Sequence, residues 1–282
     1  MIDSKIEDID ATADRGTQSV PFLKWAGGKR WLMDRHKDAF PTFSGRYIEP
    51  FLGGGSVFFR LQPESAILSD INEDLVNCYV QVRDNPLGVE ALLSEHQASH
   101  SRDHYYKVRA DRPTDPLQAA AWFLYLNRTC WNGLYRVNLK GQFNVPIGTK
   151  TKVVAETDDF EGTSKLLKNC TLQSGDFEDS IDLAEDGDLV FVDPPYTVKH
   201  NYNGFLKYNE TIFSWDDQVR LRDAVSRASR RGAKIVVSNA AHSSVIELYD
   251  GLGTQHLIDR SSVLAGKAAA RGVFQELLVV IQ

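Results

Sequence analysis

The stretch Asp188-Leu189-Val190-Phe191-Val192-Asp193-Pro194-Pro195-Tyr196 decides how this chain folds and where its chemistry is expected. Its first part is a short apolar, β-branched run, which predicts a buried strand. The strand must stop at the prolines, because neither can donate a backbone hydrogen bond to a sheet. A residue before a proline is pushed toward extended angles, which restricts the carbonyls of Asp193 and Pro194. The sequence therefore predicts a stiff strand end that presents a carboxylate, a carbonyl and an aromatic ring to one space.

These three groups suit a reaction at a planar aromatic amine, such as the exocyclic nitrogen of adenine. The lone pair of that amine is delocalised into the ring, and acceptors bonded to its two hydrogens would localise it. Asp193 and the Pro194 carbonyl would be the acceptors, while Tyr196 would stack on the base. The alternative is a plain strand-ending turn with a solvated carboxylate, and this motif alone does not decide between the two.

The composition is ordinary for a soluble globular protein of 282 residues, long enough for one large domain or one domain with an insertion. No apolar run reaches the length of a membrane span, and the first residues lack the pattern of a secretory signal. The three cysteines stand singly, without metal-ligand spacing, so we expect a reduced, cytoplasmic location and no metal site. The net charge of -6 argues only mildly against a nucleic-acid partner, because it describes the whole chain.

A strand followed by a glycine turn lies earlier in the chain. Residues 46–51 predict a short strand that runs into the turn Gly53-Gly54-Gly55 and a helix, which is the βα unit of an open α/β sheet. A second strand over 66–70 ends in Asp70, about 20 residues on, where an acid bonds ribose hydroxyls in nucleotide-binding folds. Asp70 is also a plausible helix N-cap, and the two roles are compatible. The pattern indicates a nucleoside cofactor without saying which.

A helical segment then interrupts the order of strands. Helical patterns cover about 72–108 and 116–127, and residues 127–148 alternate like a hairpin. Between Arg128 and Ala155 there are five basic residues and no acid, which is the most one-sided charge in the chain. Strands are expected again at 170–173, 188–193, 234–239 and 274–281, with a helix from Ser214 to Arg231 and a polar, lid-like segment at 197–213.

The predicted domains follow from this order. Residues 1–20 form a disordered tail, 21–74 and 150–282 form the α/β catalytic domain, and 75–149 form a target-recognition domain. The segment 261–272 is basic and rich in small residues; a plain connector is favoured there over a DNA-facing loop. None of the seven histidines stands in a spacing that indicates a metal ligand or a general base.

Six segments in order resemble the Dam-type DNA adenine-N6 methyltransferases, which use S-adenosylmethionine. The resemblance covers about residues 21–282, and its order is that of the alpha group of amino methyltransferases. It implies a Rossmann-like methyltransferase sheet with a helical target-recognition insert carrying a β-hairpin. The matching segments are Pro21–Lys29, Glu49–Gly55, Asp70, Asn127–Gly148, Ser174–Phe177 and Asp193–Tyr196.

The resemblance also implies roles for individual residues. The target adenine would be held by Asp193, Pro194, Pro195 and Tyr196. The residues that bind S-adenosylmethionine would be Trp25, Ala26, Lys29, Phe51, Gly53, Asp70, Asp176, Phe177 and Asp193. Without the resemblance, Phe177 is explained equally well as a core residue and as a cofactor contact.

The DNA-binding residues implied are Lys24, Trp131, Asn132, Arg136, Asn138, Lys140 and Pro146. A base inside a duplex cannot present its amine, so the target must be flipped out. Trp131 would wedge into the duplex, Asn132 would pair with the orphaned base, and Arg136 would read the major-groove acceptors of a guanine. Trp131 as a core residue, and Lys24 and Arg136 as solvated charges, remain alternatives.

The sequence thus predicts a site-specific adenine-N6 methyltransferase acting on double-stranded DNA in a bacterial or phage-infected cell. A GATC-like site is favoured, although Thr149-Lys150-Thr151-Lys152 departs from the aromatic-containing run of GATC readers. We expect a monomer, and pairing with a restriction endonuclease is open. Two other functional classes remain as alternatives. One is an enzyme with the same chemistry that acts on RNA or on a protein amide, and the other is a dinucleotide oxidoreductase. The Asp at 193 favours an aromatic amine over an amide, and the glycine turn lacks a GxGxxG pattern.

Overall fold

The computed structural model describes residues 20–138, 140–199, 213–261 and 273–282. They form a seven-stranded sheet in the order β3-β2-β1-β4-β5-β7-β6. Strands β1 to β5 pair in parallel, and β7 is antiparallel to both β5 and β6. The strands are β1 (Tyr47–Glu49), β2 (Ala66–Asp70), β3 (Cys170–Ser174), β4 (Leu189–Val192), β5 (Lys234–Ala240), β6 (Thr254–Ser261) and β7 (Val273–Ile281).

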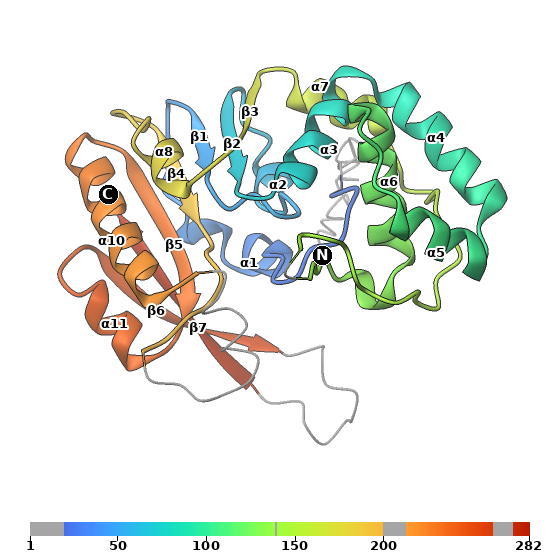
Figure 1. Ribbon diagram of the computed structural model, residues 1–282. Helices are drawn as coiled ribbons and strands as arrows, with labels where there is room; N and C mark the ends of the chain where they lie inside the picture. The colour runs from blue at the N-terminus through green and yellow to red at the C-terminus, as the bar shows by residue number, and fades with distance from the viewer. Residues whose placement is uncertain (1–19, 139, 200–212, 262–272) are drawn as a thin grey trace, which may run out of the picture.

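Helices cover both faces of the sheet, because neighbouring residues of each strand point to opposite sides (Figure 1). Val190 and Val192 of β4 pack with α8 (Phe177–Ile181), α10 (Trp215–Arg230) and α11 (Ser243–Leu248). Leu189 and Phe191 face a second core on the other side. That core includes α1 (Arg30–Arg35), the short helix η1 (Lys37–Ala39) at its edge, and α2 (Phe58–Leu61). A strand buried on both faces reads as a continuous apolar run, as β4 does.

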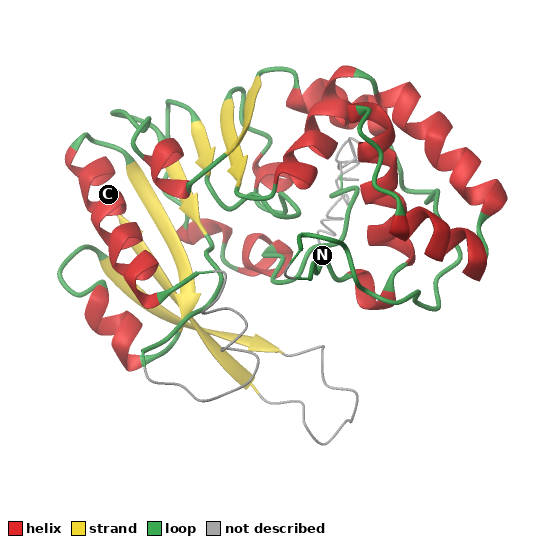
Figure 2. Ribbon diagram, in the orientation of Figure 1, coloured by secondary structure: helices red, strands yellow, loops and turns green. Residues whose placement is uncertain are grey.

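The predicted helical insert forms the other half of the molecule (Figure 2). Its helices are α3 (Glu73–Asp84), α4 (Pro86–Ser99), α5 (Arg102–Ala110) and α6 (Pro116–Thr129), followed by the short helix η2 (Trp131–Gly133). Helix α7 (Phe160–Leu167), beyond the predicted boundary at 149, contributes Phe160 and Leu167 to the core shared with α3. The domain limits themselves stay a prediction.

The hairpin prediction for 127–148 is met only in part. Two isolated bridges, Cys130 with Ile147 and Val137 with Phe143, join its two arms in place of two continuous strands. One arm is interrupted by the short helix η2, and Pro146 in the other arm has no N–H to donate, whereas Asn138 bonds the backbone of residues 140 and 142 at the turn. Helices α7, α8 and α11 and strand β6 were not predicted from the sequence.

The sheet order creates a switch point between β1 and β4. From β1 the chain moves outward to β2 and β3, whereas β4 leads to β5 on the other side. Ligands of open α/β sheets bind at the carboxyl ends of the strands beside such a point. Three groups of residues lie outside the described part: 1–19 of the predicted tail 1–20, 200–212 of the lid-like segment, and 262–272 of the segment 261–272. Within the described part of the chain, no helix combines the length and the apolar character needed to cross a membrane.

Candidate active site

Asp193 follows directly on β4, which ends at Val192 before the two prolines as predicted. The ammonium of Lys29 lies 3.0 Å from Oδ1 of Asp193 and 3.5 Å from Oε2 of Glu276. Lys29 is 3% exposed, so its charge is compensated inside the protein by these two carboxylates. The N-cap residue of α1, the residue that follows β4 and a residue of β7 therefore lie together.

Tyr196 completes this cluster. Its hydroxyl donates to Oε2 of Glu276 at 2.9 Å and lies 3.1 Å from the Ser238 hydroxyl, and Lys29 is 4.9 Å from its ring centre. Burial, together with the negative charges of Asp193 and Glu276, raises the pKa of Tyr196 well above its ordinary value. The phenol is therefore a neutral, anchored ring. The sequence-based prediction missed Glu276 and Ser238, although a carboxylate inside the buried apolar strand β7 was a signal.

The glycine turn after β1 lies against Trp25 and Asp70. Gly53 has φ of +47°, and a Cβ there would come within 2.5 Å of Cδ1 of Trp25, so only glycine fits. Its N–H donates to Oδ2 of Asp70 at 2.9 Å, while Oδ1 of Asp70 accepts from Asn72 N at 3.0 Å. Burial raises the pKa of Asp70, and these backbone bonds oppose that shift. Asn72, not Asp70, is the N-cap of α3.

Glu49, at the end of β1, is a further buried acid that the sequence-based prediction did not assign. It is 3% exposed and accepts a hydrogen bond from the Tyr47 hydroxyl at 2.9 Å. Burial raises its pKa to about 8, with a further contribution from the charge of Asp193. Glu49 is therefore mostly protonated at neutral pH. Ala26, by contrast, is exposed, and its predicted role stays a prediction.

Asp176 and Phe177 lie where β3 ends and α8 begins. Oδ1 of Asp176 caps α8 by accepting from Glu178 N at 2.9 Å. Phe177 is buried and stacks on Phe51, with ring centres 5.4 Å apart. The pair of rings joins the end of β3 to the segment after β1.

The acids stand in the order of the strands along one edge of the sheet. Asp193 follows β4, Glu49 ends β1, Asp70 ends β2 and Asp176 follows β3. With a spacing of about 4.8 Å between neighbouring strands, the edge from β4 to β3 spans about 14 Å. That length suits an extended nucleoside ligand with one end at β4 and the other at β3. The acids of this edge other than the protonated Glu49 also favour a cationic ligand.

The predicted DNA-binding residues cluster in the turn after α6 and the loop that follows it. Trp131 is 53% exposed, so the alternative of a core residue is wrong. Asn132 next to it has φ of +56°, a left-handed conformation uncommon outside glycine and typical of functional turns. Lys24 packs under this turn, since a Cβ on Gly133 would lie 2.8 Å from its Cδ. Burial and the neighbouring Lys150 lower the pKa of Lys24 to about 8.

Arg136, Asn138, Lys140 and Pro146 are all exposed on this loop. Nε of Arg136 donates to Oδ1 of Asn144 at 2.8 Å, which holds the guanidinium in place. Oδ1 of Asn138 already accepts two backbone N–H groups, so part of this side chain serves the turn itself. The Pro146 carbonyl accepts from Trp131 N at 2.9 Å and so fixes the exposed indole to the loop.

Arg128 does not belong to this surface, although it was counted in the basic stretch. It is 8% exposed and forms a two-pronged ion pair with Asp158, at 2.6 and 2.8 Å. Its guanidinium also donates to the carbonyls of Phe22 and Val153. Arg128 therefore joins α6 to two distant segments. Among the described residues, no cluster of three or more His, Cys, Asp or Glu side chains is arranged to hold a metal ion.

Comparison with known proteins agrees with this geometry. The family model of the D12 class N6 adenine-specific DNA methyltransferases matches residues 25–263. The chain is 38% identical over 268 residues to the type II methyltransferase M1.LlaDCHI of Lactococcus lactis subsp. cremoris, covering 92% of this chain and 94% of that protein. It is 34% identical over 286 residues to the type II methyltransferase M.MjaIII of Methanocaldococcus jannaschii, with 92% and 98% covered.

A further relative is the DNA adenine methylase of Escherichia coli K12, which is 31% identical over 263 residues, with 92% of this chain and 94% of that protein covered. These matches confirm the resemblance found in the sequence, and they exclude the dinucleotide oxidoreductase. The chain belongs to the D12 class N6 adenine-specific DNA methyltransferases, and it is an enzyme that acts on adenine in DNA.

Proposed function

We propose that this enzyme takes its methyl group from S-adenosylmethionine and transfers it to N6 of an adenine flipped out of duplex DNA. The observation that carries the proposal is the convergence of Asp193, Lys29, Tyr196 and Glu276 at the switch point of the sheet. This cluster supplies an oriented carboxylate and an anchored ring beside the glycine turn, which is what an aromatic amine needs.

The residues along the sheet edge fit the proposed donor. When bound, S-adenosylmethionine supplies a methyl group activated by a positively charged sulfur. Trp25 and Gly53, which lie against each other, would line the methionine end, and Asp70, bonded to Gly53 N, would take the ribose hydroxyls. Asp176 and Phe177 lie at the far end of the edge, where the adenine of the donor would bind. The acidic lining favours the cationic donor.

The target adenine is held by the strand end after β4. Asp193 and the Pro194 carbonyl accept the two hydrogens of the amine, which localises its lone pair toward the methyl group. Pro195 keeps the segment stiff, and the Tyr196 ring stacks on the base. Lys29 orients Asp193 through the 3.0 Å contact. The amine gives up a proton after transfer, and Asp193 is the nearest acceptor.

Extruding the base costs a few kcal/mol, and Trp131 and Asn132 offset this by filling the vacated place. Arg136 reads a guanine, while Lys24, Asn138, Lys140 and Pro146 position the duplex. We favour a GATC-like site. The enzyme would act as a monomer, and the type II names of two relatives keep a restriction partner open.

Expression in a methylation-free bacterial strain, followed by genome-wide mapping of modified adenines, tests activity and specificity together. We expect N6-methyladenine at GATC and not at unrelated sites. Methylation at adenines outside GATC would overturn the proposed specificity alone. No modified adenine in cells that produce the folded protein would overturn the proposed function.

A further inference from the structure

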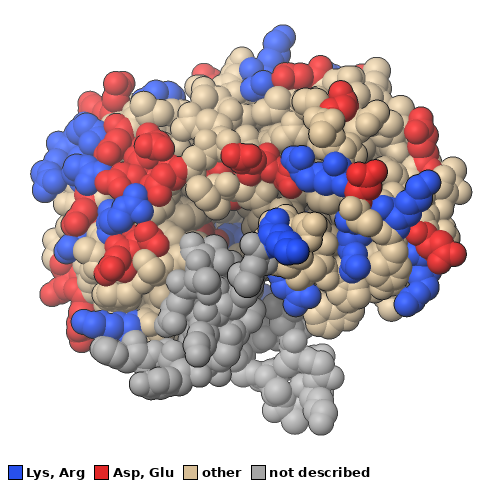
Figure 3. Space-filling model, viewed as in Figure 1, with Lys and Arg blue, Asp and Glu red and all other residues tan. Residues whose placement is uncertain are grey.

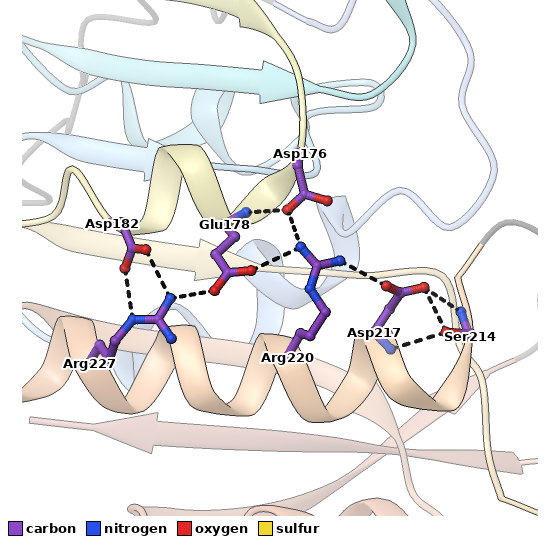
Figure 4. A network of polar contacts seen from close by, with 7 residues as sticks. All are labelled: Asp176, Glu178, Asp182, Ser214, Asp217, Arg220 and Arg227. Carbon is purple, nitrogen blue, oxygen red and sulfur yellow. Dashed lines mark hydrogen bonds and ion pairs between the residues drawn. The ribbon is translucent and has the colours of Figure 1, made fainter.

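Two arginines of α10 face α8 and bond its acidic residues (Figure 4). Arg220 and Arg227 lie seven residues apart on the same face of the helix. Figure 3 shows acidic and basic side chains side by side over the edge of the molecule that α8 and α10 form. At 44% and 35% exposure, such ion pairs contribute little to stability. The role of these ion pairs must therefore be something other than stability.

Arg220 differs from Arg227 in what it holds. Nη2 of Arg220 donates to Oδ1 of Asp176 and to Oε2 of Glu178, each at 2.9 Å, and Nη1 donates to Oδ1 of Asp217 at 2.9 Å. Its guanidinium also lies over the ring of Phe177, 4.9 Å from the ring centre. Arg227 bonds the other oxygen of Glu178, and its second partner is Asp182.

The contacts of Arg220 constrain both residues at the end of β3. Oδ1 of Asp176 accepts from Glu178 N and from Arg220, so the carboxylate is fixed in one orientation. Phe177 is held between the contacts of its ring with Phe51 and with the guanidinium. A carboxylate that is fixed before binding loses less conformational entropy when a ligand donates to it.

Arg220 also connects this place to the start of α10. Asp217 and Ser214 form the capping box of α10, with Ser214 N donating to Asp217 at 2.9 Å. One guanidinium thus bonds the capping carboxylates of two helices, Asp176 for α8 and Asp217 for α10. Phe213, directly before this cap, is the first described residue after 200–212.

We propose that Arg220 is a positioning residue for the donor's adenine, which orients Asp176 toward the exocyclic amine and clamps the Phe177 ring. The inference rests on the proposed function, because it takes Asp176 and Phe177 as the adenine-binding residues. Arg227, which shares Glu178 with Arg220 but has Asp182 as its second partner in place of Asp176 and Asp217, is its matched control.

The test measures the Kd of S-adenosylhomocysteine by calorimetry for the full chain and for the variants Arg220→Gln and Arg227→Gln. We expect Arg220→Gln to raise this Kd about five- to tenfold, the size of the cost of ordering one side chain on binding, and Arg227→Gln to change it less than twofold. The KM of the donor should rise with the Kd in Arg220→Gln. Arg220→Lys should restore part of the affinity, because lysine keeps the charge but not the planar fork.

A second ligand distinguishes a positioning role of Arg220 from a general loosening of the fold in the variant. S-inosylhomocysteine carries a carbonyl oxygen where adenine has its amine, so the wild-type protein should bind it more weakly. Arg220→Gln should narrow that difference, because Asp176 is no longer held toward the amine, whereas Arg227→Gln should preserve it. Equal Kd values and equal discrimination in the two glutamine variants would overturn the inference alone. No binding of S-adenosylhomocysteine by the wild-type protein would overturn the proposed function and this inference with it.

Discussion

Lys29, near the start of the sequence, makes ionic contacts with two carboxylates from its last third, Asp193 and Glu276, and lies over the Tyr196 ring. Asp193 and Tyr196 were predicted from a local motif, because an acid before two prolines limits its own backbone. Glu276 and Glu49 were not, because their importance comes from residues that are distant in sequence. A local pattern can show what chemistry a side chain offers, whereas its partners depend on the fold.

We predict that Asp193→Asn lowers the rate of methyl transfer at least a hundredfold, because the amide no longer stabilises the positive charge that develops on the amine. The variant should still bind S-adenosylhomocysteine within about tenfold of wild type, since other strands supply most of the donor contacts. Single-turnover kinetics and calorimetry on the same preparation check both values. A variant that turns over at the wild-type rate would show that Asp193 has no role in the chemistry.

Glu49 gives a pH-dependent prediction. Its pKa of about 8 in the folded protein exceeds its ordinary value of 4.5, because burial disfavours the charged form. The unfolded chain then loses the proton first as pH rises, so the free energy of unfolding should fall from about pH 4.5 to about pH 8.

Glu49→Gln, which mimics the protonated acid, should flatten this part of the curve in urea titrations without donor. Exposed Glu64→Gln serves as the control and should leave the slope as in wild type. If all three proteins show the same slope, Glu49 is not the group that titrates.

At the level of elements, the sequence predicted those whose signals are local. Strand β2 was predicted with its observed limits, and β4 and β5 to within a residue at each end, because buried β-branched runs end at clear breaks. The capping box Ser214–Asp217 placed the start of α10. Strand β6 was missed because it is a mostly polar edge strand, and α8 because five residues carry no helical period.

The turn formed by η2 is the element that should open the duplex. We predict that Trp131→Ala weakens binding to fully paired target DNA by 10- to 100-fold, about 1–3 kcal/mol for one lost stack. Leu134→Ala, another exposed apolar side chain of the same loop, is the control and should change binding little. On DNA with a mismatch at the target base, the loss should shrink, because less unpairing remains to be offset. An equal loss on both duplexes would argue against a wedge.

At the scale of the whole molecule, Arg128 and its ion pair with Asp158 join α6 to segments that are distant in sequence. Arg128 was counted among the basic residues between 128 and 155, and only its burial against Phe22 and Val153 shows that it does not belong to the exposed basic surface. One-sided charge in a sequence thus predicts a surface, but it does not tell which members of the run reach it.

We predict that Arg128→Met lowers the free energy of unfolding by about 3–5 kcal/mol, because it leaves a buried carboxylate without its partner. Replacing both partners by apolar residues should cost less than the sum of the two single changes. Urea titration checks this, with Lys152→Met as control, since the Lys152–Glu156 pair is exposed. A loss no larger than that of the control would mean that the buried pair is not what joins the segments.

Strand β7 is the last strand in the sequence, yet it lies between β5 and β6 and carries Glu276 to the Asp193 cluster. During synthesis, the parallel strands leave the ribosome first and cannot hold β6 until β7 arrives. The nascent polypeptide therefore acquires the carboxylate that anchors Tyr196 only when synthesis has passed Glu276. A shorter nascent polypeptide would present the aromatic ring after β4 without this anchor.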